Sequence, residues 1–143
     1  MVEHAIGDIE RRRAEALAVS ERHLAACEAK LAELENYHGV YTRQFNERAE
    51  AGIGGAGARD YQTFLARLAE AVRQQSLQVA RARTERDAER LSWQGAAQRA
   101  EVVGRLVRRW RTDEQRLADQ TEQRESDERA QHHHSHERAA HGA

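Results

Sequence analysis

Carboxylates and arginines are the commonest side chains in this sequence that could do chemistry, and they do not form the pattern of a catalytic site. The chain has 24 Asp and Glu and 23 Lys and Arg residues. They alternate at helical spacing, which is typical of a solvated helix face whose i,i+4 pairs contribute a few tenths of a kcal/mol each. The sequence has no nucleophile elbow, zinc-protease motif, dinucleotide fingerprint or paired cysteine motif. We therefore expect no enzyme activity, no catalytic residues and no cofactor.

Histidines gather near the C-terminus, at His132, His133, His134, His136 and His141. Imidazoles could bind a transition metal there, but a metal site needs ligands that converge from a folded frame. The segment from Gln131 onward has no apolar periodicity. That pattern predicts a flexible, disordered tail over residues 126–143. We therefore expect no metal site.

A short basic run surrounds Trp110 and consists of Arg105, Arg108, Arg109 and Arg111. A basic-region DNA reader would need this helix to continue directly from a parallel zipper, whereas acidic side chains follow here from Asp113. The net charge of −1 also produces no field that would attract nucleic acid or an anionic membrane. We expect no nucleic-acid partner, and interpret the run as a surface that faces protein.

Composition predicts which elements carry these side chains. The 143 residues are 39 % apolar and include no proline, which is too little apolar volume for a compact globule and is typical of long helices. Cys27 is the single cysteine, so a reducing compartment is expected. The sequence has neither a run of about 20 apolar residues nor the regions of a secretory signal. These observations predict a cytoplasmic protein.

Two helical segments, about 6–50 and about 60–125, flank a glycine-rich turn at 51–58. Glycine costs a helix interior about 1 kcal/mol relative to alanine, so glycines at 52, 54, 55 and 57 end one. Each segment carries an apolar stripe whose steps alternate three and four, the spacing of a coiled coil. The first stripe is Leu17, Ser20, Leu24, Cys27, Leu31, Leu34, His38, Tyr41 and Phe45. The second is Tyr61, Leu65, Leu68, Val72, Gln75, Val79, Ala82, Trp93, Ala96, Ala100, Val103, Val107, Trp110 and Leu117, interrupted at Arg86 and Glu89.

Single amphipathic helices are marginal in water, so the two stripes must meet. The sequence therefore predicts an all-α fold, a long antiparallel two-helix coiled-coil hairpin over residues 1–125. Folding about the glycines is expected to place Leu24 near Thr84 to Arg86.

Close to the turn, the apolar surface is wider than a seam. Tyr37 lies beside the first stripe, and Phe64 and Ala71 lie beside the second. Because two helices cover only their facing positions, some of these side chains must meet water. Exposed aromatic clusters mark interfaces, so we interpret the surface as a partner-binding patch, with a locally thickened core as the alternative.

These same residues carry a family resemblance. The segment from Tyr37 to Tyr41, the glycine turn and the Tyr61-Gln-Thr-Phe64 motif, followed by Gln75, together resemble FliJ, the small coiled-coil component of flagellar type III export. The likeness continues through Trp93 and covers about residues 5 to 120. It implies a stalk that binds the export ATPase hexamer and the cytoplasmic domain of the export-gate membrane protein, and that escorts export chaperones. It also implies a cytoplasmic protein that reaches the inner membrane only through these partners.

The resemblance assigns an export-gate-binding surface to Leu34, Tyr37, Tyr41, Phe64, Leu68 and Ala71, with Gln75 and Lys30 at its outer positions. An ATPase-facing role is expected at the end away from the glycine turn, for Arg11, Arg12, Arg13, Arg105, Arg108, Arg109 and Arg111. Two alternatives stay open at this point. One is the equivalent stalk of a virulence injectisome, and the other is a structural coiled coil that only oligomerises.

Overall fold

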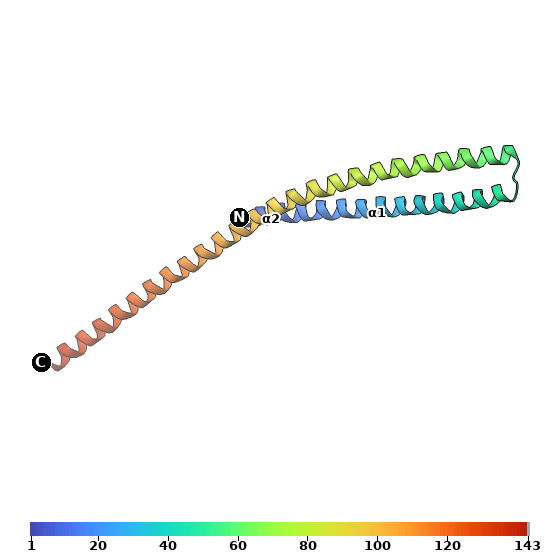
Figure 1. The fold of residues 1–143 in the computed structure, drawn as a ribbon. Helices are drawn as coiled ribbons and strands as arrows, with labels where there is room; N and C mark the ends of the chain where they lie inside the picture. The colour runs from blue at the N-terminus through green and yellow to red at the C-terminus, as the bar shows by residue number, and fades with distance from the viewer. Residues whose placement is uncertain (143) are drawn as a thin grey trace. The chain divides into compact units, whose positions relative to one another are not determined.

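The computed structural model describes residues 1–142 and forms two helices, α1 (Val2–Glu50) and α2 (Gly55–His141), with no strand in that range (Figure 1). The predicted all-α fold class is therefore confirmed. The chain divides into a hairpin unit, Gly7–Ala97, and a second unit made of Met1–Ile6 and the residues from Gln98 onward. No helix in the described range has the length and apolar character to cross a membrane.

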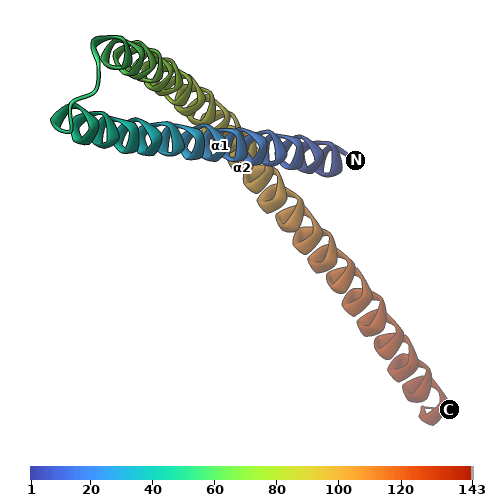
Figure 2. The ribbon, with the colours of Figure 1, turned by 90° about the vertical axis from the view of Figure 1, so that its right-hand side faces the viewer.

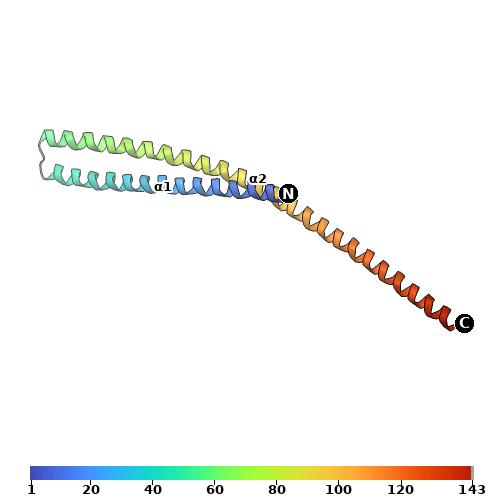
Figure 3. The same ribbon diagram turned by 180° about the vertical axis from the view of Figure 1, so that it is seen from behind.

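Within the hairpin unit, α1 and the first half of α2 lie side by side and run antiparallel. The ribbon of α1 follows the green-to-yellow part of α2 in Figures 1 and 3, and Figure 2 shows the short loop that joins them. Leu24, Val79 and Ala82 are the buried core, and Cys27 and Leu31 pack against them. Every predicted seam position of α1 from Leu17 to Phe45 is buried or half-buried. The heptad pattern thus identified the facing side chains correctly.

The two polar residues that interrupt the second stripe still lie in the seam. Arg86 and Glu89 are both half-buried, and they keep the alternation of four and three steps between Ala82 and Trp93. One carboxylate oxygen of Glu89, Oε2, is buried without a hydrogen-bond partner. The spacing of the seam therefore continues without interruption from Ala82 to Trp93, but its side chains at Arg86 and Glu89 are polar.

Two long-range hydrogen bonds cross the hairpin and fix its register. The side-chain amide of Gln75 donates to the Cys27 carbonyl at 3.0 Å, and the Trp93 indole N–H donates to Glu10 Oε1 at 2.9 Å. The expected pairing of Leu24 with Thr84 to Arg86 is wrong, because Leu24 packs against Val79 and Ala82 instead. The error is about one helical turn. It arises because the turn is shorter than predicted.

The turn spans only the residues between Glu50 and Gly55, so Gly55 and Gly57 belong to the first turn of α2. Gly52 has a φ of 87° and ends α1. The Gly52 amide donates to the Ala49 carbonyl, and the Ile53 amide donates to the Arg48 carbonyl, both at 3.2 Å. This pair of bonds is a Schellman motif, which requires a left-handed residue at the position of Gly52.

Over the described residues the expected disordered tail is wrong, because α2 continues to His141, while residue 143 of the predicted tail lies outside the described range. A helix that is already nucleated only has to propagate, which needs far less favourable sequence than starting one. No glycine or proline lies between Gly104 and Gly142, and Arg, Glu, Gln and Ala are strong helix formers. Polar i,i+4 pairs join Gln115 to Asp119 at 3.0 Å, Gln123 to Asp127 at 3.1 Å, and His133 to Glu137 at 3.5 Å.

The predicted seam ends before its last two members. Trp110 and Leu117 are 62 % and 63 % exposed, whereas Val103 and Val107 are half-buried. In the second unit, the apolar stripe of α2 therefore continues past the last position at which it is covered.

Replacing Gly52 with alanine is expected to destabilise the hairpin by about 1–2 kcal/mol, because an L side chain is strained at positive φ. Gly55→Ala is the matched control, since Gly55 starts α2 and no atom lies within 4 Å of an added Cβ. This control should be neutral or stabilising. Urea unfolding followed by circular dichroism measures both. Equal midpoints for the two variants would contradict the assigned role of Gly52.

Candidate protein-binding site

Aromatic side chains from the two helices meet across the hairpin close to the turn. Tyr41 and Phe64 pack edge to face with ring centroids 4.9 Å apart, and Phe45 lies 5.7 Å from Tyr61. The Arg48 guanidinium lies over the Tyr61 ring, 5.4 Å from its centroid. Aromatic pairs in this arrangement stabilise beyond the area that they bury. The cluster therefore holds this end of the hairpin together while part of its surface faces outward.

The outward-facing part is formed by Tyr37 and Phe64, which are 45 % and 43 % exposed. The patch residues Leu34, Tyr41, Leu68, Ala71 and Gln75 are half-buried, and Lys30 is exposed. The exposure of the two rings favours the interpretation as a partner-binding patch over a thickened core. We call the exposed and half-buried side chains among these the aromatic patch, which consists of Leu34, Tyr37, Tyr41, Phe64, Leu68, Ala71 and Gln75. Its assignment to the export gate stays a prediction.

The Tyr37 hydroxyl is oriented by its own helix. It donates to Glu33 Oε1 at 3.2 Å, one turn earlier in α1. This hydrogen bond, together with the negative charge of the Glu33 carboxylate, raises the pKa of Tyr37. The phenol is therefore neutral throughout the physiological range, and the ring is presented as an uncharged, partly apolar surface with one polar edge.

Gln75 has a different role from the one that its place on the predicted surface suggests. Its amide nitrogen donates to the Cys27 carbonyl across the seam, so this group is engaged within the hairpin. Sequence reasoning also missed the bond between Trp93 and Glu10. Glu10 lies seven residues before Leu17 and so continues the spacing of the first stripe, which was the available signal, but its partner depends on the register.

The seven arginines of the predicted ATPase-facing set are all exposed. Arg11, Arg12 and Arg13 belong to the hairpin unit, and Arg105, Arg108, Arg109 and Arg111 belong to the second unit. Arg11 pairs with Asp8, Arg105 pairs with Glu101, and Arg111 lies 3.5 Å from Glu3. Exposed pairs of this kind contribute little to stability. The ATPase-facing role of the two groups stays a prediction.

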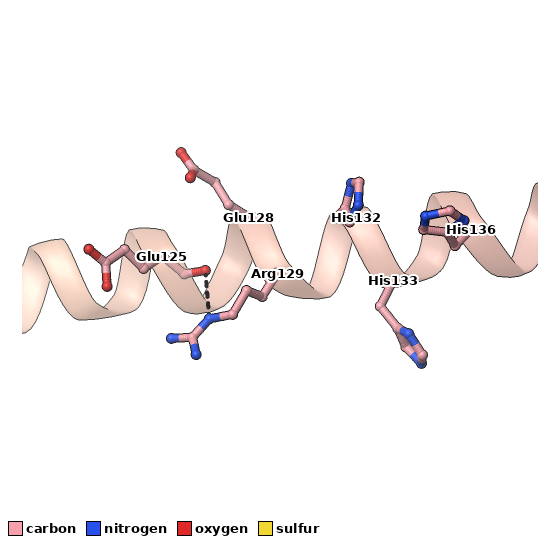
Figure 4. A pocket seen from close by; sticks show the side chains of 6 residues that line it. All are labelled: Glu125, Glu128, Arg129, His132, His133 and His136. Carbon is pink, nitrogen blue, oxygen red and sulfur yellow. Dashed lines mark hydrogen bonds between the residues drawn. The ribbon is translucent and has the colours of Figure 1, made fainter.

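A surface groove in the second unit is lined by Glu125, Glu128, Arg129, His132, His133 and His136, all from α2 (Figure 4). Because one helix lines all of it, the groove has no opposing wall that could desolvate a small substrate. The aromatic patch suits a different task, since exposed rings of this kind typically anchor a protein partner.

Comparison with known proteins agrees with this geometry. A family model described as the flagellar FliJ protein matches residues 7–139. A search of curated proteins and a search of solved structures found no match. Because the family model spans nearly the whole sequence, the chain belongs to the FliJ family of flagellar export components.

Proposed function

We propose that this protein is the coiled-coil stalk of the flagellar type III export apparatus, and that it binds the cytoplasmic domain of the export gate through the aromatic patch. One observation carries the proposal: Tyr37 and Phe64, on the two helices of the hairpin, are each more than two-fifths exposed. Large aromatic side chains gain most from burial, and they are the side chains that most often anchor protein interfaces.

The packing beneath the patch supports this role. Tyr41 holds the Phe64 ring edge to face, and Glu33 holds the Tyr37 hydroxyl. Side chains that are already oriented lose less conformational freedom when a partner covers them. A patch of this kind therefore favours a pre-formed partner groove that receives the two rings.

The same proposal gives the stalk two further partners, the export ATPase hexamer and the export chaperones. The support for the ATPase is the set of exposed arginines, above all Arg108, Arg109 and Arg111 on α2. Arginine suits a surrounding ring of acidic or carbonyl groups, because its planar fork forms paired hydrogen bonds in several registers. Association with the inner membrane then occurs only through these partners.

Tyr37→Ala is expected to raise the Kd for the purified gate domain by about fivefold or more, which corresponds to about 1 kcal/mol. Because Tyr37 lies off the seam, the free energy of unfolding should change little. Tyr37→Phe keeps the ring and loses only the bond to Glu33, so it should bind nearly as well as the original chain. Isothermal titration measures the affinity, and circular dichroism checks the fold.

Leu91→Ala is the matched control for lost apolar surface, because Leu91 is 70 % exposed and lies in the hairpin unit outside the patch. It should leave the Kd unchanged. If Tyr37→Ala binds the gate domain with full affinity, or if Leu91→Ala weakens binding as much, the aromatic patch is not the contact.

Replacing Arg108, Arg109 and Arg111 with glutamine is expected to reduce stimulation of the export ATPase and the dependence of that stimulation on salt. Between about 50 and 300 mM salt the screening length falls from about 14 to about 6 Å, so contacts that depend on charge weaken. Glutamine is a good helix former, so α2 should persist. ATP hydrolysis measured across this salt range gives both quantities.

The matched control replaces Arg116, Arg124 and Arg129, which removes the same charge further along α2. Its stimulation should follow that of the original chain. An unchanged salt response in the first triple variant would exclude those arginines as the contact. Sedimentation provides a separate check, since a chain that only oligomerises would not be mostly monomeric, as a stalk within a ring must be.

A further inference from the structure

The C-terminal part of α2 brings histidines into a fixed arrangement that a disordered tail would not have. His132 and His136 are one helical turn apart, so they lie on the same face of the helix. Their ring centroids are 5.0 Å apart, with the ring planes at 84°. Both side chains are exposed, and Figure 4 shows them on neighbouring turns. The helix therefore supplies the folded frame that metal ligands need.

This spacing suits a shared ion. A zinc ion bound by imidazole has Zn–N bonds of about 2.0–2.1 Å, so two imidazoles on one tetrahedral ion have centroids about 5 Å apart. The observed separation of 5.0 Å matches this value. The exposed rings need only turn about their side-chain bonds to aim one nitrogen each at a common point.

The charges around the pair are mixed. Glu128 lies one turn before His132 and lines the same groove. Its carboxylate would therefore attract a cation toward the histidine pair. Arg129 also lines the groove, but its Nε donates to the Glu125 carbonyl at 3.4 Å. His133 leaves the pair in another direction and lies 3.5 Å from Glu137. The ligands available to a metal ion are therefore two imidazoles, one nearby carboxylate and solvent water.

We propose that His132 and His136 form a two-ligand site for a divalent late transition ion, of the class of Zn²⁺, Ni²⁺ or Cu²⁺. Neutral imidazole is a preferred ligand of these ions, and water completes the coordination shell. No group of three or more ligating side chains able to hold a metal occurs among residues 1–142, so the site is open and exchanges its ion. Binding bridges two turns of α2, which couples the ion to the helicity of this segment.

The experiment is a calorimetric titration of the full chain with ZnCl₂ at about pH 7.5, because imidazole binds a metal ion in its neutral form. His136→Ala should weaken binding by about tenfold or more, because losing a ligand costs at least as much as losing a group that orients one. His134→Ala also removes one imidazole, but it lies two residues from each member of the pair and hence on another face. This control should bind Zn²⁺ within about twofold of the original chain.

A second comparison tests the dependence on the helix. Ser135→Pro keeps all the histidines but breaks α2 between the paired ones, whereas Ser135→Ala keeps both the histidines and the helix. The proline variant should lose binding and the alanine variant should retain it. Equal weakening by His134→Ala and His136→Ala, or undiminished binding by Ser135→Pro, would show that the histidines bind as an unstructured cluster and would overturn the proposal.

Discussion

The apolar seam between the two helices of the hairpin unit is the contact on which the other features depend. Single amphipathic helices are marginal in water, so each helix of the hairpin unit depends on the other to cover its apolar stripe. Within residues 1–142 the buried apolar side chains are only Leu24, Val79, Ala82 and Ala96, and each keeps a small exposed fraction. The buried residues therefore lie along a narrow stripe, and the stability of the hairpin depends on contacts along the length of the helices. Gln75, a polar member of the seam, forms its hydrogen bond across it and thereby helps to specify the register.

Much of this could be predicted from the sequence, because the alternation of three and four steps determines which side chains face a partner helix. What the alternation does not determine is how far one helix is shifted along the other. That shift depends on where the turn begins and ends, and Gly55 and Gly57 entered α2 despite their low helix propensity. The register consequently differs by about one turn from the expectation. The bond from Trp93 to Glu10 was out of reach for the same reason, since it exists only in the observed register.

For the candidate surfaces too, the sequence predicts features that depend on local spacing but not contacts between distant residues. Tyr37 could be identified because its position lies beside the seam, and its exposure follows directly. The edge-to-face packing of Tyr41 on Phe64 needed the structure, as did the orienting bond from Tyr37 to Glu33. Composition was misleading at the C-terminus, where polarity predicts disorder for an isolated segment. The segment is not isolated, because it continues a helix whose costly nucleation has already occurred.

Across Gly7–Ala97, the hairpin unit has a seam but no deep pocket between its helices. A ligand that needs to be shielded from water must therefore supply part of the binding surface itself. A small substrate would stay in water on either helix, whereas the proposed protein partner would supply the missing surface and exclude water from the rings of Tyr37 and Phe64. A metal ion supplies its own coordination shell, and His132 and His136 have to provide only two ligands of it. Both kinds of recognition use side chains that are not part of the seam. Positions off the seam can therefore change their specificity at little cost to the fold, whereas a seam position such as Leu24 cannot.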